Sequence, residues 1–126
     1  MRIIGHGIDL VEVARIAAVL NRHGDRFLTR VFTRAESDHS AGRRRRAEHL
    51  AGRFAAKEAA LKALGTGLAN GITWTELEVV PDAAGRPTLA LSGEALKLAG
   101  SLGVTAWQLS MTHTGEYAAA SVIALG

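Results

Sequence analysis

The alanine-rich segment in the middle of the chain, residues 44–64, constrains the fold most. Its large apolar residues recur at helical spacing and form one stripe, which comprises Leu50, Phe54, Leu61 and Leu64. Alanines cover most of the remaining circumference, and Gly65 is a natural stop directly after the segment. We therefore expect one long helix that forms the central element of the fold.

Charged side chains occupy unusual positions on this helix. At 100° per residue, Lys57 falls within the apolar stripe and Glu58 at its edge. A buried carboxylate without a partner becomes protonated, whereas a metal ion or a positive neighbour keeps it ionised. The alternative is a plain helical ion pair between Glu58 and Lys62, with Arg53 and Lys57 packing their stems along the helix.

A second carboxylate in an unusual setting ends a glycine-interrupted segment near the N-terminus. Residues 2–11 read as a buried strand that places Gly5, Gly7 and Asp9 on the face opposite His6. Glycine in a strand often marks close approach of backbone or ligand. If the fold brings Asp9 to Glu58, the two carboxylates form a hard-oxygen site suited to Mg²⁺. The alternative is that Asp9 only caps a short helix expected over 12–21.

The remaining patterns predict an α+β fold, in which a small antiparallel sheet packs against the long central helix and shorter helices. Arginines recur at i+4 spacing over 22–34 and share one face if that segment is helical. Thr33 and Glu36 form a capping box for another short helix. Residues 75–79 and 87–91 read as a hairpin, and Ser92 as the cap of a helix ending near Gly103. Strands follow over 107–112 and 117–125.

Length and composition exclude several classes of protein. A chain of 126 residues is long enough for one domain, spanning 1–126, with one core. The absence of cysteine excludes a disulfide scaffold, a thiol nucleophile and a Cys-ligated zinc site. The N-terminal apolar run is too short for a signal peptide, and no stretch approaches the roughly 18 apolar residues of a membrane span. We expect a cytoplasmic protein that does not bind membranes.

The charge is distributed unevenly along the chain. Residues 1–62 carry 13 lysines and arginines against 7 acidic residues, whereas the remainder carries 2 against 5. A basic half predicts an anionic partner, which can be a nucleic acid, a phosphorylated small molecule or an acidic protein; the alternative is a merely solvated surface. The few aromatic residues are not interleaved with the basic ones, which is unfavourable for stacking on single-stranded nucleic acid.

Three blocks of sequence resemble the short-chain branch of the 4′-phosphopantetheinyl transferases, the holo-[acyl-carrier-protein] synthase family. The blocks are Gly5–Glu12, Gly52–Gly67 and Ser110–Thr114. They arrive in the family's order and spacing, and the central block is the most specific. The sequence departs from the family pattern at His6 and Met111: the family usually has an apolar residue at the first position and Ile or Leu at the second.

The resemblance implies roles for particular residues. Asp9 and Glu58 match the positions that hold Mg²⁺ together with the coenzyme A pyrophosphate. Arg53, Lys62 and His113 match phosphate contacts. Members of the Arg43–Arg46 run are also expected to contact the phosphates, and Arg45 and Arg46 are the preferred candidates. Gly65 and Thr66 are further expected coenzyme contacts. On its own, His113 is typical of a satisfied core histidine, because it continues the apolar alternation of its strand. Its place at a strand end beside a glycine turn would equally suit a phosphate contact.

The implied reaction is transfer of the 4′-phosphopantetheine group from coenzyme A to a serine of apo-acyl-carrier protein, with release of adenosine 3′,5′-bisphosphate. Arg53 and Lys62 would stabilise charge on the leaving group, and either Glu58 or a metal-bound water would accept the serine proton. The resemblance also implies a homotrimer with sites at subunit contacts.

Arg15, Arg22 and Arg26 match the dock for the acidic carrier protein, whose identity the sequence does not name. A basic nucleic-acid-binding domain and a non-catalytic coenzyme A-binding or assembly module are the rival functions.

Overall fold

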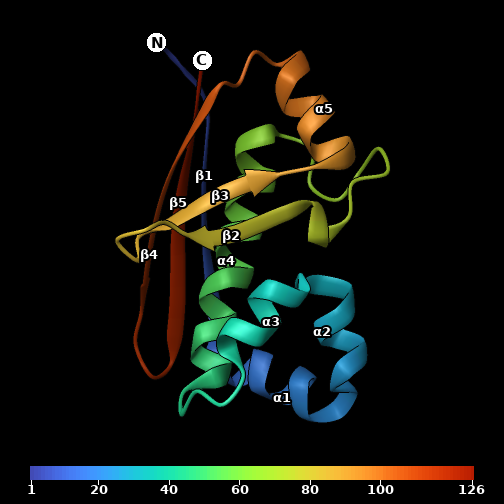
Figure 1. The fold of residues 1–126 in the computed structure, drawn as a ribbon, viewed down its shortest axis with the longest axis vertical. Coiled ribbons are helices and arrows are strands. Elements are labelled where there is room, and N and C mark those ends of the chain that lie inside the picture. The colour runs from blue at the N-terminus through green and yellow to red at the C-terminus, as the bar shows by residue number, and fades with distance from the viewer.

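The computed structural model describes residues 1–126 as one layered α+β domain (Figure 1). The predicted fold class is confirmed. The elements in chain order are β1 (Ile3–Glu12), α1 (Val13–His23), α2 (Asp25–Val31), α3 (Arg34–Ser40), α4 (Arg46–Leu64), the 3₁₀ turn η1 (Trp74–Glu76), β2 (Leu77–Pro81), β3 (Pro87–Leu91), α5 (Gly93–Ser101), β4 (Ala106–His113) and β5 (Tyr117–Leu125).

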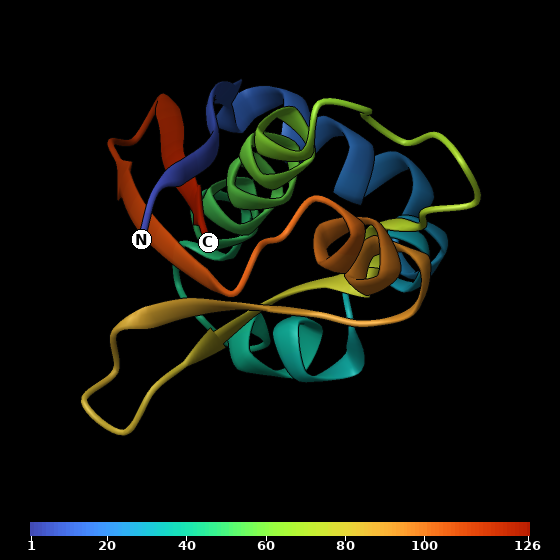
Figure 2. The ribbon, with the colours of Figure 1, turned by 90° about the horizontal axis from the view of Figure 1, so that it is seen from above.

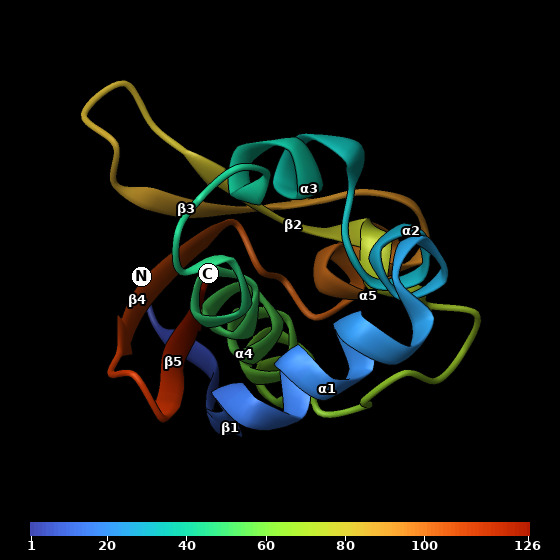
Figure 3. The ribbon, with the colours of Figure 1, turned by 90° about the horizontal axis from the view of Figure 1, so that it is seen from below.

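Helix α4 is the centre of the domain, as its composition predicts. The sheet lies along one side of the helix, and α1, α3 and the β2–β3 hairpin surround the others (Figures 2 and 3). Leu50 and the alanines at 51, 55, 56, 59 and 60 are fully buried. Gly65 ends the helix in the left-handed conformation (φ 84°), as predicted. Small side chains on several faces allow neighbouring elements to approach this helix closely.

Strand β1 packs on α4 through its two glycines. A Cβ atom at Gly5 or Gly7 would collide with backbone carbonyl oxygens of α4, those of Ala63 and Ala59 respectively. The expectation that residues 2–11 form a buried strand is confirmed for the strand but wrong for the burial of its second face, because helices cover only one face of the sheet. On the open face, Ile8 and Leu10 are 62% and 67% exposed.

The strands form two separate antiparallel sheets. The larger sheet has the order β1-β5-β4, with Asp9 opposite Ala120 and His113 opposite Ala118. Strands β2 and β3 pair only with each other, in the predicted hairpin, and their turn projects from the body of the domain (Figure 2).

The N-terminal helical region is broken into three pieces. Gly24 separates α1 from α2 at a φ of 49°, so the evenly spaced arginines at 22, 26, 30 and 34 do not share one helix face. The predicted capping box of α3, between Thr33 and Glu36, is present. Asp9 is not a cap, because it lies within β1 and the N-cap position of α1 belongs to Glu12. No helix is long and apolar enough to cross a membrane.

Candidate functional site

The close packing of β1 on α4 brings Asp9 to Lys62. The Nζ atom of Lys62 donates to Asp9 Oδ1 at 3.1 Å and to the carbonyl oxygen of Ile8 at 2.9 Å. The Asp9 side chain is only 14% exposed, whereas that of Lys62 is 53% exposed. Lys62 therefore reaches across to the strand, and its salt-bridge partner is Asp9 rather than Glu58.

Glu58 lies half-buried one turn before Lys62 on α4. Burial raises the pKa of Glu58, and the nearby charge of Asp9 raises it further. Lys62 and Arg15 act in the opposite direction. The fold therefore gathers two mutually repelling carboxylates and two cations in one place, which is the arrangement that a shared ligand needs.

The donor set at these carboxylates fits a hard divalent cation. No group of three or more histidine, cysteine or acidic side chains suited to a metal occurs in the chain, so the protein itself offers only the oxygens of Asp9 and Glu58. Mg²⁺ is commonly held by one or two carboxylates and completes its octahedron with water and substrate phosphates. A cation there would also relieve the repulsion that raises the pKa of Glu58.

Two further predicted contacts lie just beyond Lys62, at the C-terminal end of α4. The amide of Gly65 donates to the carbonyl oxygens of Leu61 and Lys62 and closes the helix. The hydroxyl of Thr66 donates to the carbonyl of Gly67 at 3.2 Å. Gly65 and Thr66 therefore lie next to Lys62, the residue that contacts the Asp9 carboxylate.

A second, basic cluster forms where the loop before α4 meets the end of β4. These two segments lie at the same end of the molecule (Figure 1). Between them is a cavity of about 290 Å³ without any hydrophobic lining residue, lined by Arg43, Arg44, Arg45, His49 and His113. A cavity lined only by potential cations is suited to a multiply charged anion.

His113 belongs to this cavity and not to the core. It lies exposed at the end of β4, and its Nδ1 donates to Glu48 Oε1 at 2.5 Å. Glu48 is buried and also lies 3.9 Å from Arg45 Nε. The core-histidine interpretation is wrong because the strand alternation brings His113 to the first turns of α4, where it meets a carboxylate.

Positive charge concentrates behind the cavity. Burial lowers the pKa of His49 to about 4, and the charges of Arg53 and Arg43 contribute to this shift. Burial also lowers the pKa of Arg53, with Arg43 as the next cause. The Nε2 atom of His49 is buried without a hydrogen-bond partner. Such a concentration of cations is costly unless an anion binds nearby.

The structure separates the two arginines that the sequence analysis singled out. Arg45 lines the cavity. Arg46 begins α4, with its Nε 3.5 Å from Ser40 Oγ, and does not line it. His49 was missed as a lining residue, although its position one turn after the arginine run was a usable signal.

The carboxylates and the basic cluster lie on different faces of α4. At 100° per residue, Glu58 is rotated roughly 140° and Lys62 roughly 180° around the helix from Arg53. Arg53 interacts electrostatically with Arg43 and His49, whereas Lys62 is bonded to Asp9. One chain therefore carries two half-sites, an acidic one at Asp9 and Glu58 and a basic one at the cavity.

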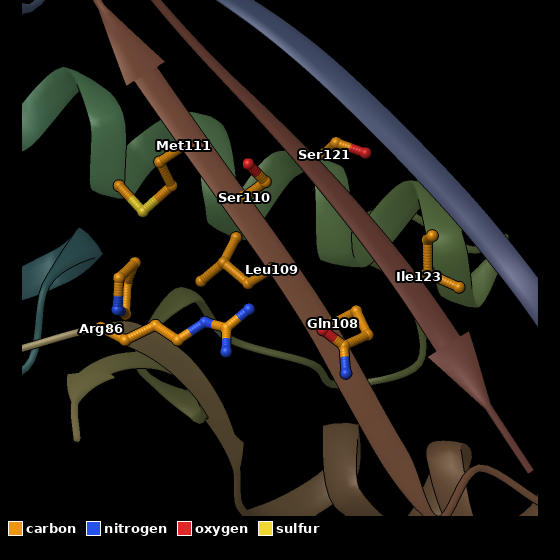
Figure 4. Close-up of a pocket in the computed structure, with 8 residues that line it drawn as sticks. Arg86, Gln108, Leu109, Ser110, Met111, Ser121 and Ile123 are labelled. Carbon is orange, nitrogen blue, oxygen red and sulfur yellow. The ribbon is translucent and has the colours of Figure 1, made fainter. Parts of the chain in front are cut away.

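A further cavity of about 310 Å³ opens where the β2–β3 hairpin approaches β4 and β5 (Figure 4). Its lining mixes polar and apolar groups: Arg86, Pro87, Gln108, Leu109, Ser110, Met111, Ser121 and Ile123. The side chain of Arg86 extends from the hairpin toward Leu109 and Gln108 in Figure 4. No sequence pattern marks this cavity, because only the fold brings the hairpin beside the sheet.

The expected docking arginines are distributed over α1 and α2. Arg26 lines a cavity of about 270 Å³ together with Val19, His23, Phe27 and Arg30. Arg22 is exposed in the last turn of α1. Arg15 is close enough to Glu58 to affect its pKa. Of the three arginines, Arg15 therefore adjoins the acidic half-site.

Comparisons with known proteins agree on one family. A family model described as the 4′-phosphopantetheinyl transferase superfamily matches residues 5–122. The chain is 50% identical over 121 residues to the holo-[acyl-carrier-protein] synthase of Koribacter versatilis (strain Ellin345), covering 96% of this chain and 97% of that protein. It is 46% identical to the holo-[acyl-carrier-protein] synthase of Edwardsiella ictaluri (strain 93-146) over the full length of both.

Solved structures of such synthases share the fold. The holo-[acyl-carrier-protein] synthase from Neisseria meningitidis superposes with a TM-score of 0.89 at 32% identity, covering 99% of this chain and 100% of that one. The synthase from Bacillus anthracis, in complex with CoA (3′,5′-ADP), has a TM-score of 0.79 at 37% identity, covering 97% and 96% respectively.

Proposed function

This chain belongs to the 4′-phosphopantetheinyl transferase superfamily, and from that premise we propose that it is a holo-[acyl-carrier-protein] synthase. It transfers the 4′-phosphopantetheine group of coenzyme A to a serine of apo-acyl-carrier protein. The observation that carries the proposal is the convergence of Asp9, Glu58 and Lys62 across the β1–α4 contact. Such an arrangement suits a phosphate-bound cation with a positive side chain beside it.

The acidic half-site binds the pyrophosphate of coenzyme A. Asp9 and Glu58 would hold Mg²⁺, which when bound neutralises charge on the pyrophosphate oxygens. Lys62 remains beside these carboxylates and offers its third N–H group to the same phosphates. Either Glu58 or a water held by the cation would accept the serine proton, because both lie at this half-site.

The reaction is a displacement at phosphorus. The serine oxygen of the carrier forms a bond to the β-phosphorus, and the bond from that phosphorus to the bridging oxygen breaks. The electron pair of the broken bond leaves with adenosine 3′,5′-bisphosphate, and the serine proton passes to the base. The chain's own contribution is to position the two reactants and to stabilise charge on the leaving group.

The basic cavity binds the 3′-phosphate of the coenzyme. Its lining of Arg43–Arg45, His49 and His113 offers several donors and includes no carboxylate. Arg53 lies behind the cavity and adds to its positive potential. This assignment accounts for cationic groups that the fold alone gives no reason to cluster.

The active site is completed by a second subunit in a homotrimer. Two properties support this part of the proposal. The half-sites lie on different faces of α4, so that one chain does not present both to the same coenzyme molecule. The open face of the β1-β5-β4 sheet carries large apolar side chains that are exposed to solvent. These side chains are Ile3, Ile8, Leu10 and Tyr117. Exposed apolar patches of this kind mark interaction surfaces.

The carrier protein docks on α1 and α2. Arg15, Arg22 and Arg26 present cations, and the cavity beside Phe27 provides an apolar contact among them. Because Arg15 affects the pKa of Glu58, a carrier bound on this face would lie close to the acidic half-site. Cationic docking surfaces attract acidic partners and raise the rate of association.

A mass measurement tests the activity. The chain is incubated with coenzyme A, Mg²⁺ and an apo-acyl-carrier protein, and the carrier should gain about 340 Da, the mass of the phosphopantetheine adduct. Asp9→Ala and Glu58→Ala should abolish the gain while the circular dichroism spectrum is unchanged. Nucleotide binding without any mass gain would instead identify a non-catalytic coenzyme A-binding module.

Subunit complementation tests the shared site. Glu58→Ala removes the acidic half-site, and the double variant Arg45→Ala/His113→Ala disables the basic one. In trimers assembled at random from equal amounts of the two chains, about a quarter of the subunit contacts regain both intact halves. Co-expression should therefore restore activity that neither variant shows alone. Activity that never exceeds the sum of the separate variants would contradict an interfacial site.

A further inference from the structure

Lys57 is a fully buried cation that the proposed reaction does not use. Its side chain is 0% exposed, and its Nζ atom lies 2.7 Å from Glu36 Oε1. The same ammonium donates to the carbonyl oxygens of Trp74, at 3.2 Å, and Leu77. Burial lowers the pKa of Lys57 and the charge of Glu36 raises it. Because no surface of this side chain is accessible, Lys57 does not touch substrate.

Glu36 is the other half of this buried pair and holds α3 in place. Its carboxylate accepts hydrogen bonds from the backbone amides of Thr33, at 2.9 Å, and Val79, at 2.8 Å. The side chain of Thr33 in turn donates to Glu78 on β2. The Lys57–Glu36 pair therefore joins α4, the start of α3 and β2 at one buried point. Removal of either partner would leave an uncompensated charge.

Helix α3 leads directly into the loop that carries the arginines. At its C-terminal end, the Nε of Arg43 donates to the carbonyl oxygen of His39 at 2.8 Å, and its guanidinium lies 3.2 Å from His39 Nε2. The His39 ring packs on that of His49, with 5.1 Å between the ring centroids. The position of α3 thus determines where this loop lies relative to the His49 side of the basic cavity.

We propose that the buried Lys57–Glu36 ion pair is a positioning device for the basic cavity, which sets the affinity for the 3′-phosphate of coenzyme A through α3 and the arginine loop. This inference rests on the proposed function. Lys57 and Glu36 are positioning residues rather than catalytic ones, since both side chains are 0% exposed. Their loss should affect recognition of the 3′-phosphate more than the chemistry at the acidic half-site.

The test compares coenzyme A with dephospho-coenzyme A, which lacks only the 3′-phosphate. The KM ratio of the two substrates is measured for the wild-type chain and for Lys57→Met and Glu36→Gln. The wild type should favour coenzyme A. In both variants the preference should fall on the order of tenfold, the value of one charge-assisted contact, because the cavity is displaced. The kcat with dephospho-coenzyme A should change less than this ratio.

Val122→Ala serves as the control for a general loss of stability. Val122 is fully buried in β5, a strand that packs against α4, β1 and β4. This variant should lose stability and keep the wild-type substrate preference. If Lys57→Met does not fold, Glu36→Gln carries the test, because its amide oxygen can still accept a backbone hydrogen bond.

Hydrogen exchange provides a second readout that does not depend on activity. Backbone amides of 34–45 should exchange faster in the folded variants than in the wild type, and those of β5 should not. Retained substrate preference together with unchanged exchange over 34–45 would overturn the inference. A wild-type chain that does not distinguish the two substrates would instead refute the phosphate assignment of the cavity, and the exchange result would still decide whether the pair positions the loop.

Discussion

Substitution of Gly7 by alanine tests whether strand and helix must touch for the acidic half-site to exist. A Cβ at Gly7 would meet three backbone atoms of α4, and the nearest is the carbonyl oxygen of Ala59. Neither backbone can rotate away as a flexible side chain would. To restore normal contact, the strand and the helix must separate locally by roughly 1.5 Å.

The separation has two measurable consequences. Forced overpacking of this kind costs about 3 kcal/mol, at the upper end of the usual range, which corresponds to a fall in Tm of roughly 10–15 °C for a domain of this size. It also moves Asp9 away from Lys62 and Glu58, and a misplacement of about 1 Å costs on the order of 100-fold in rate. We therefore expect Gly7→Ala to lower kcat/KM about 100-fold at a temperature where the protein is still folded.

Thermal unfolding by circular dichroism and the carrier-modification assay measure the two effects. Gly100→Ala is the matched control, because the same methyl group added to α5 meets no atom within 4 Å. Alanine replaces glycine there within a helix, so the control should be neutral or more stable by about 0.5–1 kcal/mol. Wild-type stability and activity in Gly7→Ala would refute the argument that direct backbone packing forms the half-site.

Three further predictions concern other parts of the molecule. The raised pKa of Glu58 means that the folded state binds its proton more tightly than the unfolded state, so ionisation of this group destabilises the fold as pH rises. Glu58→Gln should therefore raise Tm at pH 7 and lose this advantage below about pH 4. If Glu58 holds Mg²⁺ as proposed, Mg²⁺ should raise the Tm of the wild type and not that of Glu58→Gln. Burial lowers the pKa of His49 to about 4, so the unfolded state binds a proton more readily than the folded state between pH 6.5 and pH 4, and acid favours unfolding. His49→Phe should therefore reduce the loss of Tm between about pH 6.5 and pH 4. An identical loss in the wild type and the variant would contradict the burial of this imidazole. Leu10→Lys places a charge on the apolar sheet face and should convert the proposed trimer to a monomer in sedimentation experiments, with loss of activity. A fully active monomer would contradict the proposed shared site.

Much of the architecture follows from local patterns in the sequence. The alanine-rich segment, the capping box at Thr33 and the turn residues between β2 and β3 act over a few positions, so their consequences can be read without knowledge of the fold. The long helix, the hairpin and the α+β class were predicted for this reason. The end of the first helix was predicted close to its place, but the break at Gly24 within the arginine-containing stretch was not, because the arginine spacing suggested one helical face over 22–34.

The sequence predicted which residues belong to the candidate site better than it predicted the contacts among them. The apolar and glycine-rich neighbours of Asp9 and Glu58 along the chain were enough to mark these two carboxylates as a pair. The buried partnership of Lys57 with Glu36, 21 positions apart in the chain, left no periodic signal. His113 was ambiguous, because its place in the strand alternation does not reveal that a carboxylate of α4 faces it.

The sequence by itself determined which elements form and which residues carry unusual charge, because propensity, capping and periodicity are properties of neighbouring residues. Only the tertiary structure decided which charges meet. It brought Lys62 to Asp9 and Arg43 to His49, and it placed these two groups on different faces of one helix. That outcome depends on how closely backbones pack around α4, and distances across the fold are not encoded in the spacing along the chain.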